Sequence, residues 1–196
     1  MANMDTQFVM GCVSAIHELV DANEKARANK YILEFAEYSR NLLRTSREKD
    51  IPLEDEITIL HQYLSLIQLR LRTTFTTVVE VDPEVDLFDT TIPAQLVQTT
   101  INALTLEFDR LGMDLSELSI SFQVMDDLLN VAIVAHPAIQ HRSFQGIATA
   151  DKLAGLRSDR SLTAVMSAYS DVTWEFKGAN TGKNEGVTVR MSISPE

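Results

Sequence analysis

The sequence predicts an α+β protein in which a helical hairpin precedes a sandwich of helices on a mixed, mainly antiparallel sheet. Two observations carry this prediction. Apolar residues recur at the spacing of one helix face through residues 6–48, with one interruption at residues 21–23. From residue 77 onward, short β-branched runs alternate with turn residues and further helical stretches.

The predicted hairpin occupies residues 1–50. One helix is expected from about residue 6 to 20; a turn and N-cap at residues 21–23 lead into a second helix that runs to about residue 48. Two such helices bury little apolar surface by themselves. We expect the hairpin to pair with a second copy in a homodimeric four-helix bundle. The alternative is that it packs on the rest of its own chain, residues 51–196, which form the second predicted domain.

The stretch between Asp50 and Arg72 is the most informative part of the chain. Pro52 and Leu53 are expected to open a helix, and three acidic residues follow in its first turn, where they favour the positive end of the helix dipole. One apolar stripe then runs along this helix at helical spacing. It comprises Leu60, Tyr63, Leu64, Ile67 and Leu71.

The remaining elements follow from changes of period and from turn residues. Pro93 is expected to begin a helix that ends at Gly112, and Asp126 and Asp127 form the turn between two strands. The strands are expected at residues 77–81, 118–124, 129–134, 172–177 and 187–194, and a last helix at residues 160–169.

Composition excludes several classes of partner and site. A net charge of −11 argues against nucleic acid or an anionic membrane surface as partner. Cys12 is the single cysteine, so no internal disulfide forms and a cytoplasmic location is expected. We expect no membrane-spanning segment in this chain, which is either a soluble protein or the cytoplasmic part of a longer membrane-anchored one. His136 and His141 lack acidic or thiol companions, so no metal site is expected.

The segment I-P-L-E-D-E-I…Y-L-S-L-I-Q-L-R resembles the I-P-L-E-E-E-L…Y-L-x-L-E-x-x-R segment of LytS-type sensor histidine kinases of two-component systems. The resemblance covers almost the whole chain. It implies a dimerising hairpin followed by a GHKL-type ATPase-like domain of the histidine-kinase kind. The matching residues are Pro52, Leu53, Glu54, Glu56, Tyr63, Leu64 and Arg70.

The reactive histidine of that family is missing here. The family's first helix opens with N-P-H-F-L-F-N, and its phospho-accepting histidine aligns with Gln7. A glutamine amide is not a usable nucleophile toward a γ-phosphoryl group, so autophosphorylation at this position is excluded.

The residues that hold ATP and magnesium in the family are also replaced. Its glutamate and asparagine on the nucleotide-binding helix align with Asn102 and Ala103, and its adenine-binding aspartate aligns with Ala135. An unpaired adenine amino group costs on the order of 1–3 kcal/mol. The degenerate remnants are Asn102, Gly155 and Gly186, and the resemblance therefore implies no bound cofactor.

The sequence thus indicates a pseudokinase, a histidine kinase homologue that acts as a binding or scaffold protein for a response regulator or for an active histidine kinase. Phe8, Val9 and Gly11, beside the lost phospho-acceptor, are the expected contact zone. One alternative is a phosphorelay protein, a histidine phosphotransferase that carries the phosphoryl group on His17. Another is a divergent ATP-binding histidine kinase. In addition, Arg40, Arg44, Arg47, Arg70 and Arg72 form either a basic rim near the hairpin base or ordinary solvated helix faces.

Overall fold

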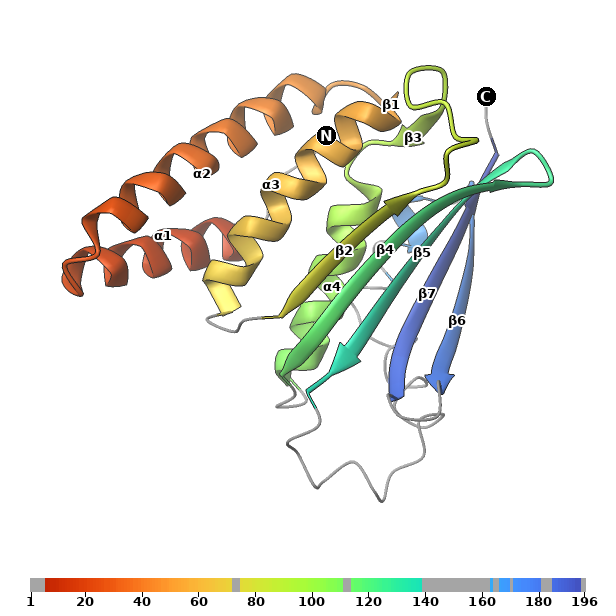
Figure 1. The fold of residues 1–196 in the computed structure, drawn as a ribbon. Coiled ribbons are helices and arrows are strands. Elements are labelled where there is room, and N and C mark those ends of the chain that lie inside the picture. Colours follow the sequence, from red (N-terminus) through yellow and green to blue (C-terminus); the bar gives the residue numbers. More distant parts are fainter. Residues whose placement is uncertain are drawn as a thin grey trace.

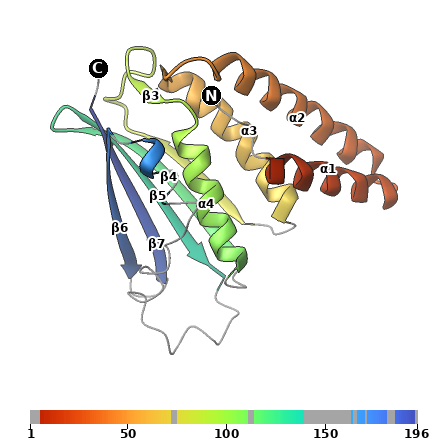
Figure 2. The same cartoon turned by 180° about the vertical axis from the view of Figure 1, so that it is seen from behind.

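The computed structural model of the protein describes residues 6–71, 75–110, 114–138, 163, 166–169, 171–180 and 185–194. Helices lead the chain and a five-stranded mixed sheet follows, which confirms the predicted α+β class (Figure 1). The hairpin, the third helix, the fourth helix and the sheet succeed one another as layers (Figures 1 and 2).

The hairpin consists of α1 (Thr6–Asp21) and α2 (Lys25–Thr45). Asn23 lies in the turn with a φ of 58°, and the N–H of Glu24 donates to the carbonyl of Leu19 over 2.8 Å. The predicted turn is correct, but the predicted N-cap is wrong. Asn23 closes the end of α1 in the left-handed conformation, which asparagine tolerates, while Glu24 precedes α2 and makes no side-chain cap bond.

The hairpin packs on α3 (Leu53–Leu71) of its own chain. The rings of Phe8, Tyr38 and Tyr63, one from each helix, have centroids 5.0–6.0 Å apart. Asn41 and Ser65 add hydrogen bonds between α2 and α3, to Gln62 and Glu34 respectively. The packing on its own chain that we weighed against dimerisation is therefore present, and it covers one side of the hairpin.

Two short strands that the sequence did not reveal pair with each other beside the start of α3. β1 (Asp50–Pro52) pairs antiparallel with β3 (Thr91–Pro93). Pro52 and Pro93 end these strands instead of opening helices, and α4 begins at Leu96 and ends at Arg110. Three-residue strands are too short to show a period of two, and the fixed φ of proline suits an extended segment as well as a first helical turn.

The main sheet has the order β2-β4-β5-β7-β6. Its only parallel pair within the described strands is β2 with β4, and the other neighbours are antiparallel. A tight turn at Asp126 and Asp127, with φ of 53° and 60°, joins β4 to β5 as predicted. The strands are β2 (Thr76–Val81), β4 (Leu115–Met125), β5 (Leu128–Pro137), β6 (Val172–Asn180) and β7 (Glu185–Ile193). The predicted helix at residues 160–169 is helical at residues 163 and 166–168, and the rest lies outside the described residues or outside helix.

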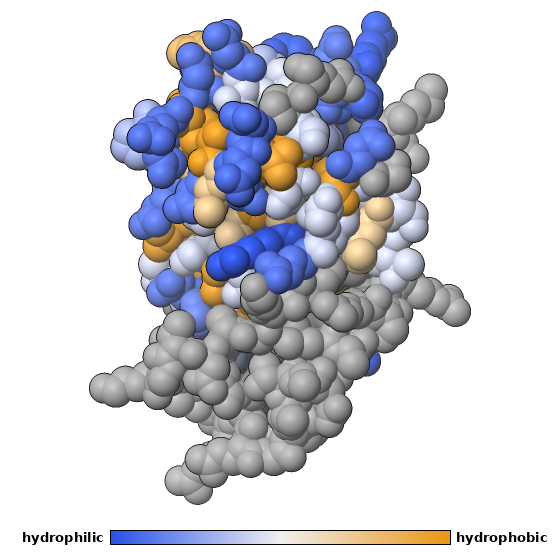
Figure 3. All heavy atoms as spheres, turned by 90° about the vertical axis from the view of Figure 1, so that its right-hand side faces the viewer, coloured by the Kyte–Doolittle hydropathy of each residue, from blue (hydrophilic) through white to orange (hydrophobic). Residues whose placement is uncertain are grey.

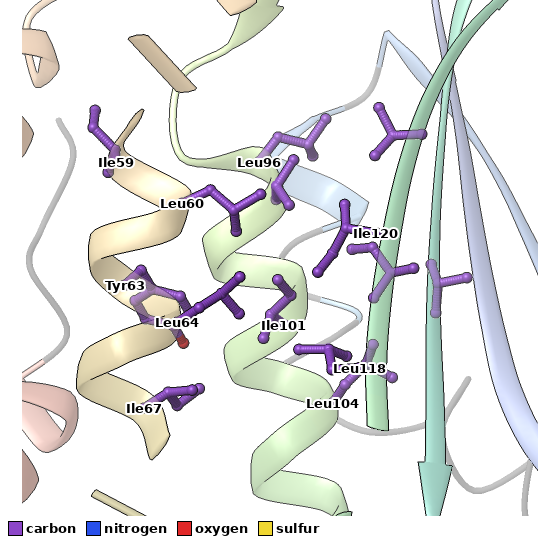
Figure 4. Packing of buried hydrophobic residues seen from close by; sticks show 14 of the residues in the cluster. Ile59, Leu60, Tyr63, Leu64, Ile67, Leu96, Ile101, Leu104, Leu118 and Ile120 are labelled. Atoms are coloured by element: carbon purple, nitrogen blue, oxygen red, sulfur yellow. The ribbon is translucent and has the colours of Figure 1, made fainter. Parts of the chain in front are cut away.

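One hydrophobic core runs through all the layers. Leu60 and Leu64 of α3 point toward α4, and Ile101 and Leu104 of α4 belong to the same cluster (Figure 4). The predicted stripe of α3 is buried at Leu60, Tyr63, Leu64 and Ile67. The hairpin contributes Phe8, Cys12, Tyr38 and Leu42 to the same core.

The sheet has one covered and one open face. β5 alternates buried residues such as Val131 and Ile133 with half-buried ones such as Ala132 and Val134, and the buried set belongs to the core beneath α4. On the side of the molecule where β6 lies, the coloured residues show polar and apolar side chains intermixed (Figure 3).

Candidate functional site

The candidate site is the region where the start of α1, the end of α3 and the middle of α4 meet. Figure 2 shows from behind that α1 begins beside α3 and that α4 lies against the sheet. Gln7, at the position of the family's phospho-acceptor, lies in the first turn of α1.

Three residues of α1 were expected to contact a response regulator, and they differ in exposure. Phe8 is only 2% exposed and packs against Tyr38 and Tyr63, so its side chain belongs to the protein's own core. Val9 and Gly11 are half-buried at the edge of the helix. Of these three residues, Val9 and Gly11 are therefore accessible to a partner and Phe8 is not.

Arg70 ties the three helices together. Its Nη1 donates to Oδ1 of Asn102 over 3.2 Å, and its Nη2 donates to Oγ1 of Thr105 over 3.3 Å. Its guanidinium carbon lies 5.5 Å from the centre of the Phe8 ring, within the range of a cation–π contact. Asn102, the expected nucleotide-site remnant, is thus bound to a protein side chain.

The arginines do not gather into one basic rim. Arg44 pairs with Asp55 on α3 over 2.7 Å, whereas Arg70 reaches α4. Arg40 and Arg47 are exposed on or just after α2, and Arg72 lies outside the described residues. The solvated-face alternative fits Arg40 and Arg47.

The other positions of the family's nucleotide boxes lie inside the core or in a strand. Ala103 is 2% exposed, Ala135 is 1% exposed, and Phe108 is 2% exposed. Phe108 aligns with the glycine that follows the family's nucleotide-binding motif, and it belongs to the same core cluster as Ala135. Gly186 pairs with Ala179 in the β6–β7 hairpin. Gly155 lies outside the described residues.

His17 is exposed on α1, and its Nδ1 lies 3.1 Å from a carboxylate oxygen of Asp21. A proton on Nδ1 can be donated to this carboxylate, and in that tautomer Nε2 is the nucleophilic nitrogen. Cys12 offers no comparable nucleophile, because burial raises the pKa of its thiol to about 11.

Glu56 is a buried carboxyl whose role the sequence did not reveal. It has no exposed surface, and its Oε1 accepts the N–H of Val97 over 3.3 Å. Burial raises its pKa to about 7, and the polar groups of Gln98, Val97 and Gln95 beside the carboxyl limit the rise. Its first-turn position on α3 was visible in the sequence, but its partners are about forty residues away.

A cavity of about 480 Å³ lies between the α1–α2 turn and the C-terminal end of α3. Its wall combines apolar side chains with the exposed Glu24–Arg27 ion pair. The lining residues are Ala15, Glu18, Leu19, Ala22, Glu24, Arg27, Tyr31, Gln68, Leu69 and Phe75. None of them is a position that the resemblance assigns to a nucleotide.

Neither a metal cluster nor a membrane helix occurs in the part of the chain that the structure describes. No group of three or more His, Cys, Asp or Glu side chains is placed there to hold a metal ion. His136 lies in β5 and His141 falls outside this part. No helix there combines the length and apolar character that crossing a bilayer requires.

The comparisons with known proteins point to histidine kinases. Residues 1–75, which contain α1, α2 and α3, match the histidine kinase family model. No curated protein matches the chain.

Three solved structures are similar to this chain at low identity and with TM-scores below 0.5. The histidine kinase AdeS of Acinetobacter baumannii is 14% identical, with 95% of each chain covered and a TM-score of 0.49. The catalytic domain of the histidine kinase ThkA is 14% identical over 74% of this chain and 94% of its own, with a TM-score of 0.46. A bacterial phosphotransferase is 10% identical over 94% of this chain and 88% of its own, with a TM-score of 0.45. The family match thus covers the helical part of the chain, α1 to α3.

Proposed function

We propose that this chain is a two-component signalling protein that works as a pseudokinase scaffold. In this proposal two copies pair through the α1–α2 hairpin, and the dimer binds a response regulator or an active histidine kinase without phosphorylating itself. Gln7 supports the loss of autophosphorylation, because its amide cannot take the place of the phospho-accepting histidine.

The observation that carries the proposal is an uncovered apolar face on the hairpin. Of the nine large hydrophobic side chains exposed among the described residues, six lie on α1 and α2. Those of α1 are Met10, Val13 and Val20, and those of α2 are Ile32, Leu33 and Leu43. On α1 the spacings are three and seven residues; on α2 Leu33 and Leu43 are ten residues apart and Ile32 adjoins Leu33. Spacings of three, seven and ten residues return to one side of a helix, as in a bundle seam.

This face points away from the helix that already covers the hairpin. The buried residues of α2, including Tyr38 and Leu42, face α3, whereas Leu33 and Leu43 are 66% and 67% exposed. Exposed apolar side chains that gather on one element mark an association surface more often than a solvated one. A second hairpin would bury them and complete four helices.

The test is the mass of the protein in solution. We expect the wild-type chain to be a dimer by light scattering after size-exclusion chromatography, and the Leu33→Glu/Leu43→Glu variant to be a monomer with unchanged helix content. Met125→Glu is the matched control, because Met125 is also an exposed apolar residue but lies at the β4–β5 turn, 57% exposed. A wild-type monomer at concentrations well above those in a cell would contradict the proposal.

A histidine phosphotransferase is the second candidate, and the surroundings of His17 favour it. Its side chain is 74% exposed, and Asp21 holds Nδ1 so that Nε2 is available as the nucleophile. In this reaction Nε2 attacks the phosphorus of an aspartyl phosphate, a P–N bond forms, and the P–O bond to the aspartate breaks.

The two candidates make opposite predictions for His17. It falls between Val13 and Val20 on the apolar face, so a bundle built on that face encloses it, whereas a phosphotransferase needs it accessible. With radiolabelled receiver domains as donors, a phosphotransferase transfers label to wild type, less to Asp21→Asn and none to His17→Ala. Label that persists on His17→Ala would eliminate this candidate.

A further inference from the structure

Arg70 is the one half-buried guanidinium in the described structure that is held by neutral groups. It lies in the last turn of α3, and its two hydrogen-bond acceptors are an amide and a hydroxyl oxygen on α4. Its Nε is enclosed and has no hydrogen-bond partner. By contrast, a carboxylate pairs with each of Arg27, Arg44, Arg110 and Arg190.

The surroundings hold this guanidinium in one place. A Cβ at Gly11 would lie 2.8 Å from Cδ and 2.9 Å from Cγ of Arg70, so α1 crosses the arginine stem only because residue 11 is glycine. The ring of Phe8 covers one side of the guanidinium, and Asn102 and Thr105 fix its nitrogens. An arginine fixed in this way loses little conformational entropy when it binds a ligand.

The charge of Arg70 is only partly balanced. The carbonyl end of the α3 dipole favours a cation at this position, and two hydrogen bonds of 3.2 and 3.3 Å are long for a charged donor. A guanidinium has five N–H donors in a planar fork that matches the oxygens of a phosphoryl group. In Arg70 the Nε–H is enclosed and one N–H of each Nη donates to α4, so two N–H groups remain, and no carboxylate of the described residues pairs with them.

The location connects this group with the proposed function. Gly11 is four residues after Gln7, one helical turn along α1, so the guanidinium lies beside the end of α1 that aligns with the phospho-acceptor site. We propose that Arg70, positioned by Asn102 and Thr105, forms an oxyanion site that binds the phosphoryl group on the aspartate of a response regulator. This inference rests on the proposed function. It means that the scaffold distinguishes the phosphorylated response regulator from the unphosphorylated one.

The first experiment tests the anion site without any partner. Inorganic phosphate is titrated into the isotope-labelled protein, and backbone amide shifts are followed by NMR. We expect saturable shifts at Gly11, Cys12 and Asn102 at millimolar phosphate, weakened roughly tenfold or more in Arg70→Gln, since the loss of a bidentate charged contact costs at least that factor. Arg40→Gln is the control, because it removes one positive charge from an exposed position of the same hairpin.

A conservative variant keeps the test valid if Arg70→Gln unfolds. Arg70→Lys retains the charge but not the fork, so we expect weaker phosphate binding at unchanged helix content. Phosphate shifts that are equal in wild type, Arg70→Gln and Arg70→Lys would overturn the site.

The second experiment asks whether the phosphoryl group is recognised on a protein. Receiver domains are tested for binding with and without beryllofluoride, which mimics the aspartyl phosphate. We expect a preference for the beryllofluoride form that disappears in Arg70→Gln and persists in Arg40→Gln.

The outcomes separate this inference from the proposed function. If receivers bind equally in both forms, or if their preference survives in Arg70→Gln, Arg70 does not recognise the phosphoryl group. Either result leaves the scaffold proposal standing. If phosphate binds at Arg70 but receivers show no preference for the beryllofluoride form, the site binds free phosphate and not the phosphorylated regulator. If no receiver binds at all, regulator binding and recognition of the phosphorylated regulator both fail, and the phosphate titration alone decides the anion site.

Discussion

Glu56 is the residue that joins the first turn of α3 to the first turn of α4. The N–H groups at the start of α4 lack partners within the helix, and the carboxyl of Glu56 accepts one of them from Val97. A side chain that is distant in the sequence thus does the work of an N-cap. The second oxygen, Oε2, is enclosed without a hydrogen-bond partner, so the ionised form is poorly solvated.

The pH dependence of stability follows from this burial. The pKa of Glu56 is raised from 4.5 to about 7 in the folded protein, so between these values the folded state binds a proton that the unfolded state has released. Stability from this group is therefore full below pH 4.5 and falls as the pH rises to about 7. A shift of this size corresponds to a loss on the order of 3 kcal/mol.

The variant Glu56→Gln isolates this effect, because it keeps an acceptor for Val97 but cannot ionise. We expect its free energy of unfolding, relative to wild type, to increase by about 1–3 kcal/mol between pH 5 and pH 8. Urea unfolding of both proteins at the two pH values measures the difference. A difference that stays constant with pH would show that Glu56 does not titrate in this range.

At the scale of the elements, long periodic segments were predictable and short ones were not. Several residues repeat one pattern in α3, from Leu60 to Ile67, and in β5. These repeats predict which face of each element is buried. β1 and β3 have three residues each, so their pairing depends on contacts between positions about forty residues apart. Local sequence carries no sign of such a pairing.

The candidate site shows the same limit. The glutamine at position 7, where the resembled family has its phospho-acceptor, can be read from the sequence, and so can the histidine at position 17. The contacts of Arg70 with Gly11 and Asn102 cannot be read from the sequence, because they depend on how α1, α3 and α4 cross. The sequence grouped Arg70 with four other arginines, as a basic rim or as solvated helix faces, whereas the structure shows Arg70 in contact with Phe8, Asn102 and Thr105.

At the scale of the whole molecule, the layers place two positions of the family's nucleotide boxes in the hydrophobic core. The hairpin packs on α3, α3 packs on α4, and α4 packs on the sheet, so one apolar core continues from Phe8 to Val189. Phe108 and Ala135 are part of this core. Residues at family positions that approach or specify adenine thus contribute to stability.

This arrangement predicts that ATP and ADP do not bind between α4 and the sheet. Adenine would lack its carboxylate acceptor at Ala135, a loss on the order of 1–3 kcal/mol, and the side chain of Phe108 would have to leave the core. We expect calorimetry to give no saturable heat with either nucleotide at micromolar concentrations, with or without magnesium. Arg70→Gln serves as the control, because any weak millimolar heat that it removes comes from phosphates at Arg70 instead of from a nucleotide on the sheet. Magnesium-dependent micromolar binding that survives Arg70→Gln would instead identify a divergent ATP-binding kinase.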